Sequence, residues 1–186
     1  FNSALGYESL ALNTTGNYNV AVGSAALSQN TTAADNAAVG YHALTANTTG
    51  ASNTAVGYRA LLANTTASNN TAVGHDAAIA NTTGHESIFI GGNAGATVTE
   101  GSNNICIGYL SGNHNINLTT GERNLLIGNY SDVGAADTDE ANVIGYNVTG
   151  AGGYTTLGTA ADDIRAAHGN VTWATVSDER YKKDIV

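Results

Sequence analysis

The chain repeats a short unit whose best-formed copy reads Asn53-Thr54-Ala55-Val56-Gly57-Tyr58-Arg59-Ala60-Leu61-Leu62-Ala63-Asn64-Thr65-Thr66. A glycine marks each copy, and successive glycines are 17 residues apart, except for one step of 20 (128 − 108). These expected turn glycines are Gly6, Gly23, Gly40, Gly57, Gly74, Gly91, Gly108, Gly128 and Gly145. A period of 17 is too short for two helices and a turn, and it suits one coil of a solenoid built from short strands and tight turns.

The residues before each glycine are expected to form the strand, because Val, Ile and Thr favour strands while Gly and Asn favour turns. The residue immediately before the glycine is aliphatic in every copy, which predicts a core ladder. Its members are Leu5, Val22, Val39, Val56, Val73, Ile90, Ile107, Ile127 and Ile144. The middle strand residue should face the other way, and it is also apolar: Ala4, Ala21, Ala38, Ala55, Ala72, Phe89, Cys106, Leu126 and Val143.

A strand that is apolar on both faces is buried on both faces. One thin coil does not easily cover both, so we expect another copy of the chain to cover the alanine column. The sequence therefore predicts an all-β parallel β-solenoid (a β-roll or β-helix) with 17-residue coils. We expect it to assemble as an intertwined or side-by-side homotrimer, with the chain itself as its first partner.

Two further columns follow the same period. One carries Leu10, Leu27, Leu44 and Leu61, and then continues with the smaller residues Ala78 and Gly95. The other opens each Asn-Thr-Thr triplet and consists of Asn13, Asn30, Asn47, Asn64 and Asn81. Each triplet is also a glycosylation sequon. Because the triplets track the coil period, a turn ladder of stacked side-chain amides is favoured over glycosylation.

Composition narrows the classes of function. The net charge is −9 and charged residues are only 11% of the chain, against about 25% in ordinary soluble domains. Scarce Lys and Arg argue against binding to nucleic acid or to an anionic membrane surface. One cysteine, Cys106, excludes an intrachain disulfide framework and a CxxC metal site. No cofactor is expected.

The chain divides into three parts by its repeat pattern. Residues 1–150 form the solenoid array, regular to about residue 96 and irregular over 97–150, where one insertion falls between Tyr109 and Arg123. Residues 151–176 lose the period and are expected to form a stem or transition. Residues 177–186 are abruptly charged. Since the first residues already lie inside a repeat, we expect a fragment of a longer protein.

The unit Asn-Thr-Ala-Val-Gly-Tyr-x-Ala-Leu resembles the head repeats of trimeric autotransporter adhesins, and the resemblance covers residues 1–150. It implies a left-handed parallel β-roll of three chains, although the repeats of that family are usually shorter than 17 residues. The resemblance is specific for architecture rather than for function.

The end of the chain, Ser177-Asp178-Glu179-Arg180-Tyr181-Lys182-Lys183-Asp184-Ile185, looks like the start of the endosialidase-type intramolecular chaperone found at the C-terminus of phage tail fibres and tailspikes. That resemblance implies trimerisation followed by a single self-cleavage, with Ser177 as nucleophile and Lys182 as activating base. A desolvated Lys is a plausible base for a Ser hydroxyl. Tyr181 stands where the family usually has Leu. A charged, solvated tail is the alternative.

The repeats also offer a stripe of aromatic residues that is a candidate for facing a receptor. Tyr stripes stack on sugars or bind proteins, and they also pack between neighbouring coils. The members of the stripe are Tyr7, Tyr41, Tyr58, Tyr109 and Tyr146. His75 takes the same place in its copy. Trp173 is expected to pack where three chains converge.

Metal and catalytic constellations are not apparent in the sequence. The five His residues show no paired spacing. The acidic loop 132–140 lacks any calcium-loop spacing, so a solvated loop is favoured over a cation site. No recurring acidic pair suggests glycoside cleavage.

We therefore expect a structural and receptor-binding segment of a viral (phage) tail fibre, located on the virion tail or an extracellular surface and attaching to a host glycan or protein. It is not expected to be an enzyme, apart from self-cleavage. Three rival readings remain: a bacterial trimeric surface adhesin, a tailspike-like glycan depolymerase, and a monomeric rod that presents its Thr-rich turns to ice or another surface.

Overall fold

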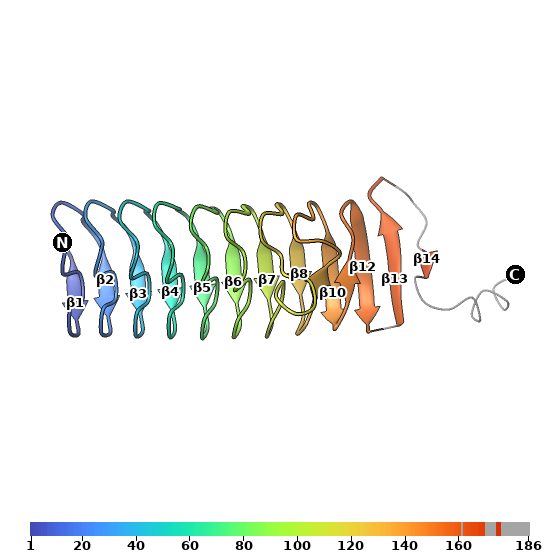
Figure 1. Ribbon diagram of the computed structural model, residues 1–186, viewed down its shortest axis with the longest axis horizontal. Coiled ribbons are helices and arrows are strands. Elements are labelled where there is room, and N and C mark those ends of the chain that lie inside the picture. Colours follow the sequence, from blue (N-terminus) through green and yellow to red (C-terminus); the bar gives the residue numbers. More distant parts are fainter. Residues whose placement is uncertain (161, 170–173, 176–186) are drawn as a thin grey trace, which may run out of the picture.

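The computed structural model describes residues 1–160, 162–169 and 174–175. In this part of the chain every element is a strand, and the coils stack into one straight rod (Figure 1). No helix in the described residues has the length and apolar character needed to cross a membrane. The strands are β1 (Ser3–Leu5), β2 (Val20–Val22), β3 (Ala37–Val39), β4 (Thr54–Val56), β5 (Thr71–Val73), β6 (Ile88–Ile90), β7 (Ile105–Ile107), β8 (Leu125–Ile127), β9 (Asp132–Val133), β10 (Asn142–Tyr146), β11 (Thr149–Gly150), β12 (Tyr154–Thr159), β13 (Asp162–Ala167) and β14 (Ala174–Thr175).

The main sheet has 12 strands, and those from β1 to β12 pair in parallel, one per coil. Each pair joins equivalent residues of successive coils, so Ala38 lies beside Ala55 and Ala55 beside Ala72. Across the insertion the register is kept, because Cys106 pairs with Leu126. The predicted fold class is thus confirmed: the chain is a parallel β-solenoid of about nine turns with coils of about 17 residues.

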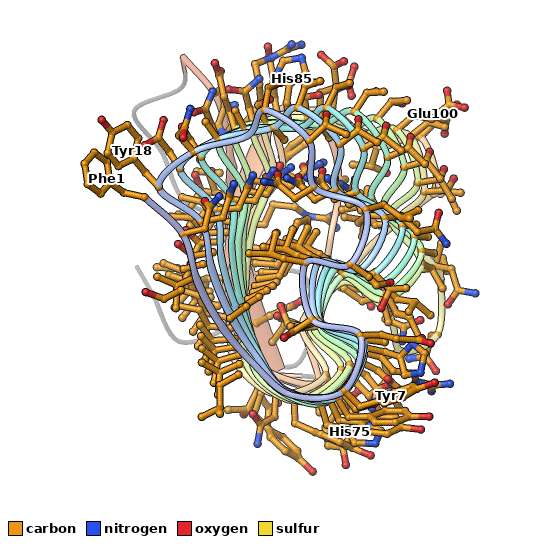
Figure 2. All side chains as sticks on the ribbon, turned by 90° about the vertical axis from the view of Figure 1, so that its left-hand side faces the viewer. Phe1, Tyr7, Tyr18, His75, His85 and Glu100 are labelled. Carbon is orange, nitrogen blue, oxygen red and sulfur yellow. The ribbon has the colours of Figure 1, made fainter. Side chains whose placement is uncertain are left out.

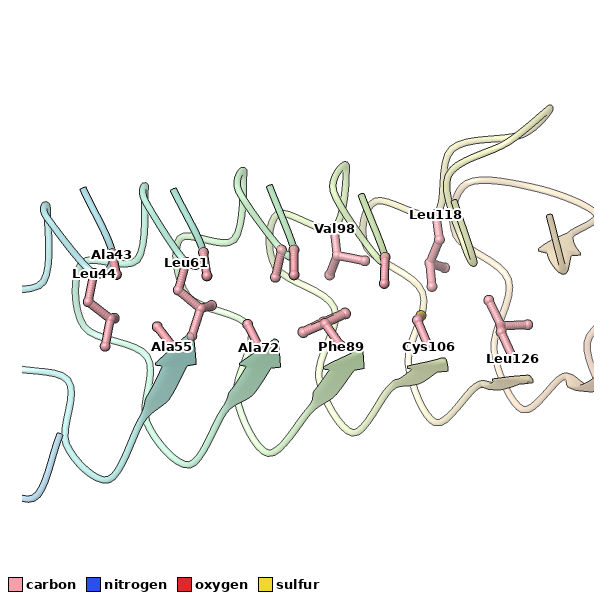
Figure 3. Close-up of a cluster of buried hydrophobic side chains, with 14 of the residues drawn as sticks. Ala43, Leu44, Ala55, Leu61, Ala72, Phe89, Val98, Cys106, Leu118 and Leu126 are labelled. Atoms are coloured by element: carbon pink, nitrogen blue, oxygen red, sulfur yellow. The ribbon is translucent and has the colours of Figure 1, made fainter. Parts of the chain in front are cut away.

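The core lies inside the single chain, between the sheet and the opposite wall of the coil. The middle residue of the strand is fully buried from β2 onward, in the column Ala21, Ala38, Ala55, Ala72, Phe89, Cys106, Leu126 and Val143. Leu44 and Leu61 point from the opposite wall toward this column (Figure 3). The small alanine side chains let that wall approach closely, so one coil closes around its own core.

The aliphatic column before each glycine lies on the outside of the sheet, which corrects the predicted core ladder. Its exposed fraction is 38% at Val56, 39% at Ile90, 41% at Ile144 and 71% at Leu5. Val22, Val39, Val73, Ile107 and Ile127 also retain partial or full exposure. The prediction had the two faces reversed: the alanine column needs no second chain to cover it, and the aliphatic column is the one left open.

The turn glycine after each strand is required by both backbone angle and space. Gly57 has a φ of 138°, and a Cβ on it would overlap the carbonyl of Gly74 in the next coil. Any side chain here would push the coils apart. This explains why glycine recurs at every copy of the position.

The regular stacking changes near the C-terminal end of the rod. The three-residue insertion belongs to a loop in which Asn113 and Asn117 form an isolated bridge. The sheet continues past residue 150, because β12 pairs in parallel with β10. β13 then pairs antiparallel with β12, and β14 antiparallel with β13. Strands β9 and β11 form a separate two-stranded sheet.

Candidate binding surfaces

The outer sheet face, defined as the first and third residues of β1–β8 and β10, is an uncharged and mostly aliphatic surface outside the core. None of these residues is charged. The first-position column reads Ser3, Val20, Ala37, Thr54, Thr71, Ile88, Ile105, Leu125 and Asn142. Carbon-rich side chains cover this side in Figure 2, between the corner at Tyr18 and the edge at His75. The face is continuous because every coil repeats the same two positions in register.

The aromatic stripe borders this face, immediately after the turn glycines. Tyr41 and Tyr58 stack with ring centroids 5.4 Å apart, and Tyr58 stacks on His75 at 4.9 Å. Cross-coil packing, one of the two readings of the stripe, therefore exists here. The rings still remain 49% exposed at Tyr41 and 42% at Tyr58.

The other members of the stripe are arranged differently. Tyr109 and Tyr146 each meet the edge of Tyr130, with centroids 5.6 Å away in both cases. Tyr7 is exposed at the first coil, where the neighbouring Glu8 raises the pKa of its phenol by hydrogen bonding and by its charge. Tyr130 belongs to the next column and was not singled out from the sequence. Its coil stacks between those of Tyr109 and Tyr146, which brings its ring between two stripe members.

An ion pair adjoins the stacked rings. Arg59 donates from Nε and Nη2 to both carboxylate oxygens of Asp76 in the next coil, at 2.8 and 2.6 Å. The guanidinium lies 4.9 Å from the Tyr58 ring centre. Hydrogen bonding to Asp76 raises the pKa of Arg59. His75 Nδ1 is 3.4 Å from the same carboxylate. The result is an aromatic surface with a fixed, charge-balanced polar border.

The Asn-Thr-Thr asparagines form a buried amide ladder, as the favoured turn interpretation predicts. Asn47 donates to Asn30 Oδ1 at 3.1 Å and to Gly50 O at 2.9 Å, and Asn64 donates to Asn47 Oδ1 at 2.9 Å. From Asn30 to Asn81 the residues are fully buried. Their amides are therefore not accessible for glycosylation in the folded chain.

A second asparagine ladder precedes the strands and was missed in the sequence. Asn53 Oδ1 accepts from the backbone N–H of Asn70 at 3.0 Å, while its Nδ2 donates to Ala67 O at 2.8 Å. The column consists of Asn2, Asn19, Asn36, Asn53, Asn70, Ser87, Asn104 and Asn124. Its signal was present, since Asn stands directly before nearly every strand in phase with the glycines.

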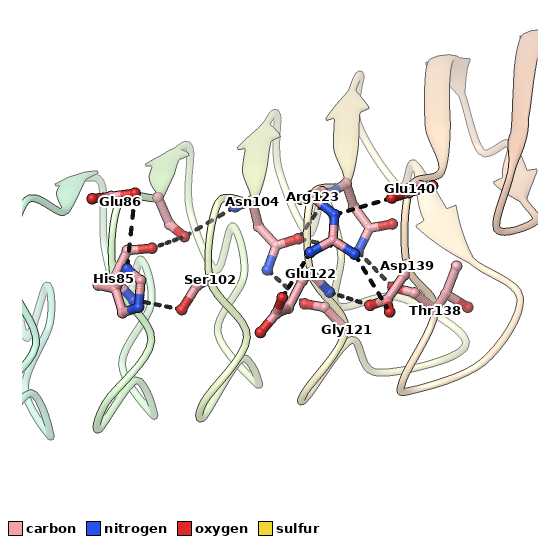
Figure 4. Close-up of polar contacts among 12 residues, drawn as sticks. His85, Glu86, Ser102, Asn104, Gly121, Glu122, Arg123, Thr138, Asp139 and Glu140 are labelled. Carbon is pink, nitrogen blue, oxygen red and sulfur yellow. Dashed lines mark hydrogen bonds and ion pairs between the residues drawn. The ribbon is translucent and has the colours of Figure 1, made fainter. Parts of the chain in front are cut away.

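Charged residues gather at the corner of the coils around Arg123. It donates to Glu140 Oε1 at 3.1 Å and to Glu122 Oε2 at 2.9 Å, and it lies 4.0 Å from Asp139 (Figure 4). The pKa of Arg123 is raised, mainly by its hydrogen bond to Glu140. These side chains are about half exposed, so the cluster is a solvated surface network.

The acidic loop contributes one buried carboxylate that holds the insertion loop. Asp132 is fully buried, and its Oδ2 accepts from the backbone N–H groups of Asn115 and Ile116 at 2.7 and 2.8 Å. It thereby anchors the insertion loop. Within the described residues, no group of three or more His, Cys, Asp or Glu side chains is placed to hold a metal ion.

Cys106 is buried in the core column, and burial, with a smaller effect from Asp132, raises the pKa of its thiol to about 12. Such a thiol is not a nucleophile at neutral pH.

The residues predicted for self-cleavage, Ser177 and Lys182, lie outside the described residues, as does Trp173. No protein-family model, curated protein or solved structure matches the chain.

Proposed function

We propose that the chain is a segment of a homotrimeric viral tail fibre that holds a receptor-binding surface away from the particle and attaches it to the host. The observation that carries the proposal is the outer sheet face, an uncharged band with an aliphatic third position in every coil, which stays open in the single chain. Contiguous apolar patches of this kind mark interaction sites in soluble proteins.

Copies of the same chain are the partner that fits this band best. The band runs the length of the rod, which spans roughly 40 Å for about nine coils at about 4.8 Å each. Only a partner of the same length and periodicity covers it completely. Three parallel rods that turn their sheets toward a common axis place equivalent residues at the same level.

The remaining surfaces suit a structural and recognitional role. The buried amide ladders and the in-register sheet make a stiff rod. Receptor contact, whether to a glycan or to a protein, then falls to the residues that stay outside the trimer. A bacterial trimeric adhesin uses the same rod and the same interface, and it predicts a downstream membrane anchor and no cut at Ser177.

Oxidative cross-linking tests the assembly. In a Cys106→Ala background, Val56→Cys should form interchain disulfides, because equivalent Val56 side chains meet near the trimer axis. Thr66→Cys is the matched control, since Thr66 is exposed on a different side of the coil. Absence of cross-linking at Val56, or equal cross-linking at both positions, would contradict the proposal.

The self-cleavage is tested separately. In a chain extended by a complete chaperone domain, intact-mass analysis should show a cut at Ser177 that Ser177→Ala abolishes. An uncut chain would favour the adhesin.

A further inference from the structure

The stacked part of the aromatic stripe differs from the rest of the rod surface. We define the aromatic strip as Tyr41, Tyr58 and His75, together with Arg59, Asp76 and Asn93. These three polar residues of the neighbouring column directly follow Tyr58, His75 and Gly92 in the chain. The three rings stack nearly parallel, with interplanar angles of 11° and 16°. All three remain exposed to solvent. The strip therefore combines an ordered aromatic surface with a polar edge.

The ring stack ends at small residues on both sides. The same column carries Ser24 in the coil before Tyr41 and Gly92 in the coil after His75. In the described part of the chain, no ring pair joins His75 to Tyr109, the next aromatic member. One ring is thus missing from the stack at Gly92, and no described ring pair covers the face of His75 on that side. The Tyr109 ring borders the gap from the next coil, because a Cβ on Gly92 would lie 3.3 Å from its Cδ2 atom.

The polar edge of the strip is held in place before any ligand arrives. Asp76 is nearly buried and takes two hydrogen bonds from Arg59, which fixes the plane of the guanidinium. Nη1 of Arg59 has no partner among the described residues, and the group remains partly exposed. It can donate to a hydroxyl oxygen. Asn93 adds an amide beside the missing ring.

The charge of the strip selects among ligands. Arg59 and Asp76 neutralise each other, and the chain as a whole carries −9. A phosphorylated or polyanionic ligand meets no excess positive charge here. A neutral sugar ring has apolar C–H faces that pack on aromatic rings and a rim of hydroxyls that pair with guanidinium, carboxylate and amide groups.

We propose that the aromatic strip binds a neutral glycan chain, with one sugar ring against the open face of His75 next to Gly92 and neighbouring hydroxyls paired to Asn93 and to Nη1 of Arg59. The inference rests on the proposed function, and it names the receptor class of the fibre. The strip lies beyond the turn glycines, at the border of the outer sheet face, and the inference requires that it stay free when the sheets associate.

The test is binding of the purified protein to immobilised neutral polysaccharides (dextran and mannan, and an uncharged bacterial O-polysaccharide) and to hyaluronate as the acidic counterpart. We expect binding to a neutral glycan. His75→Ala and Tyr58→Ala should weaken it at least about fivefold, the scale of one lost aromatic contact. Tyr18→Ala is the matched control, because Tyr18 is an exposed tyrosine at a different corner.

Gly92→Tyr is the sharpest variant. Other coils carry Tyr at this position, so the protein should fold after a small shift of the Tyr109 ring, which lies 3.3 Å from a Cβ on Gly92. The added ring fills the gap and blocks the glycan. The inference is overturned if no neutral polysaccharide binds, if only hyaluronate binds, or if Gly92→Tyr and His75→Ala bind like the wild type. It is also overturned if these variants lose binding only because the oligomer dissociates. A trimer without glycan binding would leave the fibre proposal standing and remove this one.

Discussion

The ring of Phe89 fills the space inside the coil that a side chain at position 95 would otherwise occupy, and this position is Gly95. A Cβ on Gly95, which has a φ of 56°, would overlap the ring of Phe89. In the coils of β2, β3 and β4 the equivalent positions hold a small strand residue and a large wall residue, as in Ala55 and Leu61. The sixth coil reverses the sizes, so the larger side chain comes from the strand and the smaller residue from the opposite wall.

This exchange predicts strong coupling between the two positions. Gly95→Leu should destabilise the protein by about 3 kcal/mol or more through overpacking, and Phe89→Ala by about 3–5 kcal/mol through a cavity. The double variant recreates the pairing of the β4 coil and should recover most of the loss. Denaturant unfolding of all four proteins gives the coupling energy. Losses that simply add would show that the two side chains do not share space.

The amide ladder predicts that replacing an asparagine destabilises the protein more in the middle of the ladder than at its end. Asn47 both donates and accepts within the ladder, whereas Oδ1 of Asn81 is buried without a partner because the next coil has Val98. Asn47→Ala should therefore cost about 1–2 kcal/mol more than Asn81→Ala, since only the former removes an acceptor in use. Denaturant unfolding of the two variants measures the difference. Equal costs would contradict the ladder.

Because its thiol is buried, Cys106 should make the protein less stable at high pH. Its thiol pKa is about 12 in the folded chain, against an ordinary value of 9.0. The unfolded chain therefore releases this proton first, and the stabilising effect, complete below pH 9, falls as the pH rises toward 12. The slope should be about 1.4 kcal/mol per pH unit.

Cys106→Ala is the control for this effect, since alanine occupies the same column in other coils. The variant should lack the extra slope in unfolding measured between pH 9 and 11. Rapid reaction of native Cys106 with a thiol reagent at pH 8 would also contradict its burial.

The hydrogen bonds of Asp132 predict that the conformation of the insertion loop depends on this one carboxylate. Asp132→Ala leaves the N–H groups of Asn115 and Ile116 without their acceptor, and it should cost about 3 kcal/mol. Asp137→Ala, in the acidic loop 132–140 but exposed, should change stability by less than about 0.5 kcal/mol. Thermal unfolding of the pair decides the point, and similar melting temperatures would argue against the anchoring role.

The repeat of Gly57 and its equivalents was enough to predict the coil, its length and the strand register, because each of these follows from spacing alone. The inward and outward sides were not predictable in the same way. Ala55 and Val56 are both apolar, so alternation indicates two opposite faces without saying which one the coil encloses. What decides the matter is the opposite wall at Ala60 and Leu61, whose approach requires the smaller residue inside.

Features that depend on contacts between columns could not be predicted from the sequence either. The compensation of Phe89 by Gly95 becomes visible only when both are known to point into the same core. The ring gap at Gly92 is visible as a missing Tyr in the column, yet its meaning depends on the stacking of Tyr58 and His75. The second asparagine ladder was overlooked because Asn next to a strand also reads as an ordinary turn residue.

The central claim is that the outer sheet face is buried between copies of the chain, and native mass by light scattering tests it most directly. The wild type should have a mass near 56 kDa, three times 18.8 kDa. Val39→Glu/Val56→Glu places charges on the outer sheet face and should give the monomer mass of 18.8 kDa. Thr49→Glu/Thr66→Glu, with the same added charge on exposed turn residues, should remain trimeric. A wild-type mass of 18.8 kDa would contradict the account.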